Sequence, residues 1–182
     1  MGDRDLNEKG KVLALGLLFV VCLMLAYAEN LFFFQSLGDV FAQPWKAVLV
    51  VFSHNVLAVS LFVLGMSFYV RFVLNFLPPR RYKYVVLEHP RLFASVFTIM
   101  ILAISILRAN TLLGGAILSN AMFVILLSLP QGILEAYAIF LAIEKTLEKR
   151  MTKRKLVTVY MLFFLAALLE VGFIQLLLMV SR

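Results

Sequence analysis

Four ionisable residues lie inside or at the ends of long apolar runs: His54, Arg108, Glu135 and Glu170. A charged group is costly inside a bilayer, so such residues usually face the interior of a helix bundle and often have a function. A histidine and two carboxylates have the chemistry to bind a cation, relay a proton or act as acid and base. In the alternative interpretation the glutamates only join helices by hydrogen bonds, each worth about 1 kcal/mol in a membrane.

Three of these residues are expected at similar depths. Counted from the flanking basic or aromatic residues at 1.5 Å per residue, Glu135 is about 15 Å and Glu170 about 22 Å from one membrane boundary, and His54 is about 13 Å from the other. All three distances fall in the middle half of a hydrocarbon core about 30 Å thick. The spacing therefore permits a mid-membrane polar cluster built from three segments.

The residues before Glu135 form a second pattern. Pro130 removes one backbone hydrogen bond from a helix, and Gly132 would let a neighbouring helix approach closely. Gln131 and Glu135 are four residues apart, which places them on one helix face. They would present an amide and a carboxyl to the backbone groups of an interrupted helix, and to Asn110 if that residue folds inward.

This pattern resembles the signature of a known family. Leu129-Pro130-Gln131-Gly132-Ile133-Leu134-Glu135 is similar to the Pro-His-Gly-apolar-apolar-Glu element of the stage II sporulation protein M family. The segment Asn110-Thr111-Leu112-Leu113-Gly114 resembles that family's Asn-Gly-x-x-Gly element, and His54-Asn55 resembles its paired asparagines. The resemblance covers roughly residues 50–145.

The resemblance implies a five-helix membrane protein without catalysis of its own. The family's namesake anchors a cell-wall-remodelling machine during engulfment in endospore formers, by binding peptidoglycan hydrolases. The positions carried over as a structural or binding motif are Asn55, Asn110, Gly114, Pro130, Gln131, Gly132 and Glu135. This chain has Gln131 where the family usually has histidine, Thr111 in place of a glycine and His54 in place of an asparagine. Glu135 matches the signature directly.

Composition and hydropathy define the elements that must position these residues. The chain has 182 residues, of which 63% are hydrophobic and 15% charged, and its mean hydropathy is +0.99. A soluble domain is only about half apolar. The sequence therefore predicts a single all-α, polytopic transmembrane helix bundle with about five spans, at residues 12–28, 46–70, 92–107, 111–143 and 156–180.

The fourth predicted span is irregular. Residues 111–143 contain one charged residue, Glu135, and would make a continuous helix about 50 Å long. That length exceeds one crossing but does not allow two crossings and a turn. Because Gly114, Gly115 and Pro130 disfavour a regular helix, we expect a broken or re-entrant segment around residues 108–132.

Charge distribution predicts the orientation of the chain. Of its 17 Lys and Arg residues, 14 fall in the N-terminal tail and in two connections, at residues 71–91 and 145–155. The positive-inside rule then places the chain in the cell membrane with the N-terminus in the cytoplasm and the C-terminus outside. This rule also accounts for the net charge of +7 without nucleic acid as a partner.

Other chemistry finds little support in the sequence. Cys22 is the only cysteine, no cysteine–histidine spacing suggests a metal site, and no nucleotide-binding motif is present, so we expect no cofactor. Small residues four apart, Gly115 with Ser119 and Ala138 with Ala142, let helices approach closely. Such pairs either close the bundle within one chain or form a homodimer.

Three functional hypotheses follow. The first is a non-enzymatic, homo-oligomeric scaffold in the lipid bilayer that recruits protein partners. The second is a small transporter or permease-like subunit that uses His54, Glu135 and Glu170. The third is an intramembrane enzyme, which would need an arranged nucleophile and base that the sequence does not contain.

Overall fold

The computed structural model describes residues 42–76, 85–112 and 121–180, together with scattered positions between residues 10 and 40. Within the described part the chain is helical and contains no strand, which confirms the predicted all-α class. The helices are α2 (Pro44–Phe76), α3 (Val85–Glu88), α4 (Pro90–Leu112), α6 (Ala121–Leu147) and α7 (Lys153–Val180).

Local chemistry explains where these helices begin. Helices α2 and α4 both start with a proline, Pro44 and Pro90, whose missing N–H group would have no partner at that position. Helix α7 starts after Thr152, whose hydroxyl oxygen accepts a hydrogen bond of 3.4 Å from the Lys155 N–H group. A side-chain acceptor at this position satisfies one of the free donors at a helix N-terminus.

Three described helices are long and apolar enough to cross a membrane: Pro44–Phe72, Pro90–Leu107 and Lys153–Leu176. They agree with the spans predicted at residues 46–70, 92–107 and 156–180. About half of the first predicted span, residues 12–28, lies outside the described residues. One described position from it, Gly16, lies against the ring of Phe68 in α2.

The structure corrects the expected interruption at Pro130. Helix α6 is continuous over 27 residues and contains Pro130 in its interior. A proline removes one backbone hydrogen bond, but the neighbouring groups still need partners where water is scarce, so the helix continues. Residues 108–112 also belong to a helix, the end of α4, whereas residues 113–120 lie outside the described residues.

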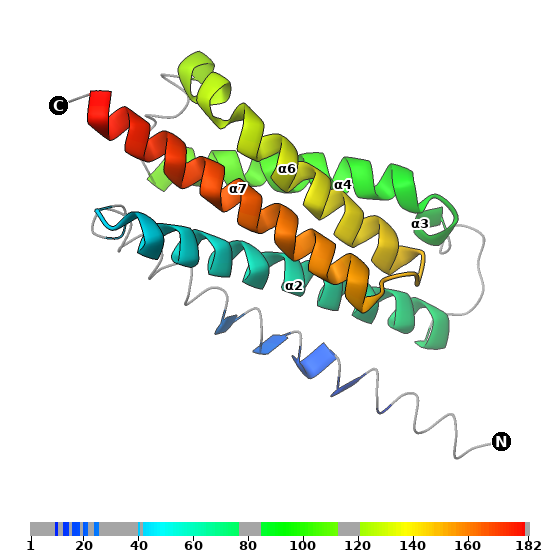
Figure 1. The fold of residues 1–182 in the computed structure, drawn as a ribbon. Coiled ribbons are helices and arrows are strands. Elements are labelled where there is room, and N and C mark those ends of the chain that lie inside the picture. Colours follow the sequence, from blue (N-terminus) through cyan, green and yellow to red (C-terminus); the bar gives the residue numbers. More distant parts are fainter. Residues whose placement is uncertain are drawn as a thin grey trace.

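Helix α6 is the central helix of the bundle. It packs against α2, α4 and α7, and Figure 1 shows it running between α4 and α7. At 1.5 Å per residue it is about 40 Å long, similar to its neighbours. Val70, near the end of α2, clusters with Leu147 at the end of α6, so these two helices run parallel.

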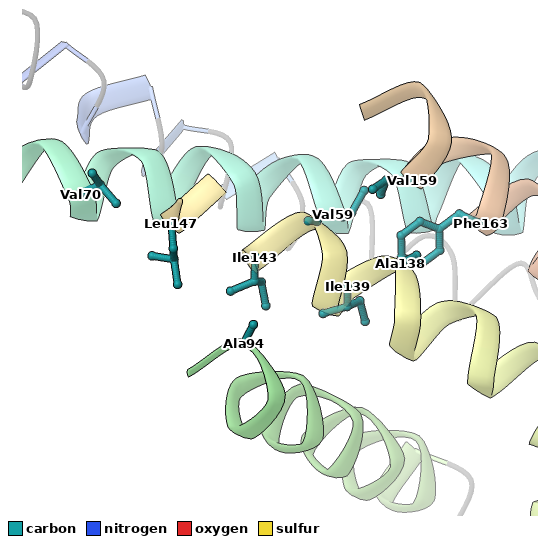
Figure 2. Close-up of a cluster of buried hydrophobic side chains, with 10 residues drawn as sticks. Val59, Val70, Ala94, Ala138, Ile139, Ile143, Leu147, Val159 and Phe163 are labelled. Atoms are coloured by element: carbon teal, nitrogen blue, oxygen red, sulfur yellow. The ribbon is translucent and has the colours of Figure 1, made fainter. Parts of the chain in front are cut away.

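The main core is built around two small residues of α6. Ala138 and Ala142 have no exposed surface, and Figure 2 shows Ala138 beside Phe163 of α7 and Val59 of α2. The other members of this cluster are Val70, Ala94, Ile139, Ile143, Leu147 and Val159. The Ala138–Ala142 pair therefore closes the bundle within the chain, which was one of the two alternatives for it.

A second, smaller cluster joins α2 to α7 near the other end of the bundle. Ala47, Val48 and Val51 pack there against Ala167 and Val171. Next to this cluster, the rings of Phe52 and Phe164 meet edge to face with centroids 5.4 Å apart. These contacts hold α7 antiparallel to α2, and so fix which α7 residues share a level with the middle of α2.

Candidate functional site

The centre of the candidate site is a hydrogen bond between two helices. The Asn55 side-chain amide on α2 donates to Glu135 Oε1 on α6 at 3.1 Å. Both side chains are half-buried within the bundle. The sequence resemblance had assigned both residues to the motif, and the structure brings them together across 80 positions of the chain. Their bond ties the middle of α2 to the central helix.

Glu170 brings a second carboxyl group from α7. It is half-buried and close enough to Glu135 for the two charges to repel each other. Three helices therefore contribute polar groups to one region: an amide from α2 and one carboxyl each from α6 and α7. Glu135 and Glu170 are two of the three residues, with His54, that the sequence predicted for a mid-membrane polar cluster.

Gln131 lies one turn before Glu135 on the same side of α6. Its Oε1 atom is buried and makes no hydrogen bond within the described part of the chain. The same holds for Thr98 Oγ1 on α4. A buried carbonyl oxygen that lacks a donor costs about 1–3 kcal/mol, so this atom is expected to need a partner from outside the described residues.

Gly132 does not have the role expected for it. A Cβ atom built on this residue would meet nothing within 4 Å among the described residues. The close approach between helices occurs further along α6, at Ala138 and Ala142. Gly132 lies seven residues before the buried Ile139 and so shares its side of α6, but no described neighbour comes close at this level.

Of the other candidate residues from the sequence, the structure describes some only in part. His54 is half-buried in α2 next to Asn55. The backbones of Arg108 and Asn110 belong to the end of α4, but their side chains, like all of Gly114, lie outside the described residues. Among the described residues, no group of three or more His, Cys, Asp or Glu side chains is arranged to hold a metal ion.

A polar contact that the sequence did not indicate joins α2 to α7. Ser60 donates its single hydroxyl proton to the Val56 carbonyl at 2.6 Å, so Tyr160 donates its own to Ser60 Oγ at 2.9 Å. Serine and tyrosine are common enough in spans that neither position stands out in the sequence. The contact adds a second polar link on α2, about one and a half turns from Asn55.

The sequence also gave no indication of a charged cluster at the end of α6. The Glu144 side chain is only 5% exposed, and its two oxygens pair with Arg91 of α4 at 2.8 Å and with Lys145 at 2.7 Å. Lys145 also pairs with Glu148 at 3.0 Å. Arg91 belongs to the basic connection at residues 71–91, and Glu144 immediately precedes the one at residues 145–155. They become partners because the start of α4 and the end of α6 lie at the same end of the bundle.

These ion pairs govern the titration of the cluster. Burial acts to raise the pKa of Glu144, but the pairs with Lys145 and Arg91 outweigh it and hold the pKa below its ordinary value. The bonds from Lys145 to Glu144 and Glu148 raise the pKa of Lys145. Glu144 and Lys145 are therefore ionised near neutral pH, and the Arg91–Glu144 pair fastens the start of α4 to the end of α6.

The two clusters differ in the chemistry open to them. The cluster at the end of α6 is compensated in charge and serves as a clamp. The cluster of Asn55, Glu135 and Glu170 has acceptors and an amide donor, which suits helix-to-helix hydrogen bonding, proton exchange or cation contact.

Comparison of the chain with family models, curated proteins and solved structures gives no match. The resemblance to the stage II sporulation protein M family therefore stays a prediction from the motif residues.

Proposed function

We propose that this protein is a non-enzymatic membrane scaffold, similar in role to the stage II sporulation protein M family, that presents a rigid helix bundle to partner proteins in the bilayer. The observation that carries the proposal is the Asn55–Glu135 hydrogen bond. The glutamate of the motif is engaged by a neighbouring helix, as expected of a residue that fixes packing.

Further support comes from the contacts that hold the bundle together. Asn55, Ser60 and Arg91 each connect to α6 or α7 through a polar contact in addition to the apolar core. A scaffold needs such fixed internal geometry, while its outward faces stay free for lipids and partners. Large apolar side chains such as Leu92, Val96 and Ile99 on α4 point outward and are exposed.

We further propose that the end of the bundle with the α6–α7 turn lies in the cytoplasm. The described basic residues at this end are Arg71, Arg91, Lys145, Lys149, Arg150, Lys153, Arg154 and Lys155. At the opposite end Lys46 precedes the membrane core of α2, next to the exposed Trp45. The positive-inside rule then assigns the orientation, with the N-terminus inside and the C-terminus outside.

One observation favours a second candidate, a small transporter. Glu135 and Glu170 lie within electrostatic range of each other on two packed helices, and the buried Gln131 Oε1 atom lies one turn from Glu135 on the same side of α6. Paired carboxyls at membrane depth are typical of proton or cation pathways.

Substitution of Glu135 distinguishes the two functions. A glutamine at this position keeps an oxygen that can accept from Asn55 but cannot carry charge or exchange a proton, whereas a leucine removes both abilities. For a scaffold we expect Glu135→Gln to unfold like wild type in detergent, and Glu135→Leu to lose about 1–2 kcal/mol of unfolding free energy.

The same variants are then reconstituted in vesicles that contain a pH-sensitive dye. A scaffold predicts proton flux equal to that of protein-free vesicles for wild type and for both variants. Flux in wild type that disappears in Glu135→Gln would establish the transporter instead. Photo-crosslinking from Ile99, on the exposed face of α4, should capture a defined protein in cells, equally well in wild type and in Glu135→Gln.

A further inference from the structure

The α6–α7 turn and the first turn of α7 carry an unusual density of positive charge. Lys149, Arg150, Lys153, Arg154 and Lys155 are five cations within seven positions. The first four are exposed and the fifth is half-buried. The first turn of α7 contains no acidic residue, although negative charge is what stabilises the start of a helix.

The acidic residues nearest to these cations are already engaged. Glu144 pairs with Arg91 and Lys145, and Glu148 pairs with Lys145. Glu88, another described acidic residue at this end, belongs to α3, which packs beside α4. The five cations are therefore left without an acidic partner among the described residues, and their mutual repulsion favours an external anion.

The surface of α7 that continues from these cations is apolar. Val157, Met161 and Leu165 follow Lys153 at intervals of four residues, so they lie along one side of the helix below it. Their exposed fractions are 57%, 54% and 47%. This stripe lies within the membrane-crossing part of α7, Lys153–Leu176. A cationic rim directly above an exposed apolar stripe matches a molecule with an anionic head and a hydrocarbon tail.

We propose that this surface is a binding site for anionic phospholipids. The phosphate headgroup contacts Lys149, Arg150, Lys153 and Arg154, and an acyl chain lies along Val157, Met161 and Leu165. A free phosphate ion would use the cations but gain nothing from the stripe. A phospholipid uses both, which is why we assign the site to a lipid headgroup.

The test uses the full chain, purified in a neutral detergent, and native mass spectrometry. The protein is mixed with phosphatidylglycerol or with phosphatidylcholine of the same acyl chains, and the bound lipid is counted. We expect wild type to retain phosphatidylglycerol preferentially. The double variant Lys153→Gln, Arg154→Gln should bind it about 25-fold more weakly, at roughly fivefold for each cation removed.

Two further variants serve as controls. Lys46→Gln makes the same substitution at the opposite end of the bundle and should leave the preference unchanged. The exchange Lys153→Arg, Arg154→Lys keeps both charges and should also retain it. Because this exchange preserves the charge at both positions, a loss of preference there would mean that folding, rather than charge, explains the first variant.

Three results would overturn the proposal. The first is equal retention of the two lipids by wild type. The second is displacement of phosphatidylglycerol by inorganic phosphate at equal concentration, which would indicate a site for free anions. The third is a dimer whose formation excludes the lipid, which would mean that a second copy of the chain covers the stripe.

Discussion

Two glutamates on one helix, Glu135 and Glu144, differ in role because they differ in partners. Glu135 accepts a hydrogen bond from the neutral Asn55 amide in the middle of the bundle. Glu144, nine residues later, is nearly buried but contacts two cations at the margin of the bundle. Burial alone therefore does not identify a functional carboxylate. What distinguishes the two residues is whether a compensating charge lies within reach.

The Glu144 cluster predicts how stability changes with pH. The pKa of Glu144 in the folded protein lies below its ordinary value of 4.5. The carboxylate therefore contributes fully to the free energy of unfolding above pH 4.5, and this contribution is lost as the pH falls through the folded pKa. We expect wild type to be more stable than Glu144→Gln near neutral pH by about 1–3 kcal/mol. This difference should shrink below pH 4.5.

Thermal unfolding of both proteins in detergent across this pH range measures the difference. Glu148→Gln is the matched control, because among the described residues Glu148 pairs with Lys145 alone and should show a smaller effect at neutral pH. Lys145 sets the upper end of the pH range in which these ion pairs stabilise the fold. Its pKa is raised above 10.5, so its contribution to the free energy of unfolding should persist below pH 10.5 and disappear at higher pH. A gap between wild type and Glu144→Gln that is constant down to acidic pH would contradict this account.

At the scale of elements, the α6–α7 turn shows how a short connection joins two long helices. The Arg150 N–H group bonds to the Lys145 carbonyl at 2.9 Å, and the Lys149 N–H group bonds to the Thr146 carbonyl at 3.0 Å. This pair of bonds is the Schellman motif that closes many helices, and it requires a left-handed residue. Here that residue is Lys149, with a φ of 55°.

This turn predicts a stabilising substitution. Glycine adopts the left-handed conformation without the steric cost of a Cβ atom, so Lys149→Gly should raise the unfolding free energy by about 1 kcal/mol. Lys149→Ala removes the same charge but keeps the strain, and should show no comparable gain. Chemical denaturation in neutral detergent compares the two. Equal stability of the glycine and alanine variants would rule out strain at this position.

Pro130 in α6 shows how an element can differ from its local sequence signal. A proline usually ends a helix in water, where the freed carbonyl can bond to solvent. In α6 the helix continues on both sides of it, packed against three other helices. The local cost of the proline is therefore smaller than the cost of exposing several backbone groups at membrane depth.

The whole molecule places its charges at the ends of a helix bundle. The end of α2, the start of α4 and the α6–α7 turn lie at one end, as the Arg91–Glu144 pair and Figure 1 show. Connections that are separate in the sequence thus form a single basic margin. The proposed orientation and the proposed lipid site both depend on this arrangement.

Cysteine labelling tests the orientation. In a Cys22→Ser background, Trp45→Cys and Arg150→Cys place single thiols at opposite ends of the bundle. A membrane-impermeant maleimide added to intact cells should label Trp45→Cys, and should label Arg150→Cys only after the membrane is permeabilised. The reverse pattern would place the basic end outside and remove the basis for a cytoplasmic N-terminus.

The sequence alone determined that the chain is helical and crosses a membrane, and it located three of the spans to within a few residues. These properties depend on the solvent that each segment can tolerate. The apolar residues of a run such as 92–107 favour lipid, and the charges of a connection such as 145–155 favour water. Each segment's own composition sets this preference, whatever the rest of the chain does. Motif similarity further brought Asn55 and Glu135 into one hypothesis.

The tertiary structure decided which side chains meet. The sequence did not single out Glu144, and only the packing of α4 on α6 brought Arg91 to it. Gly132 looked like a close-contact residue, but the contacts formed at Ala138 and Ala142. Which face of a helix packs inward depends on every neighbouring helix at once, and one residue of register changes it by about 100°. For that reason pairings between helices, unlike spans, cannot be obtained from local composition.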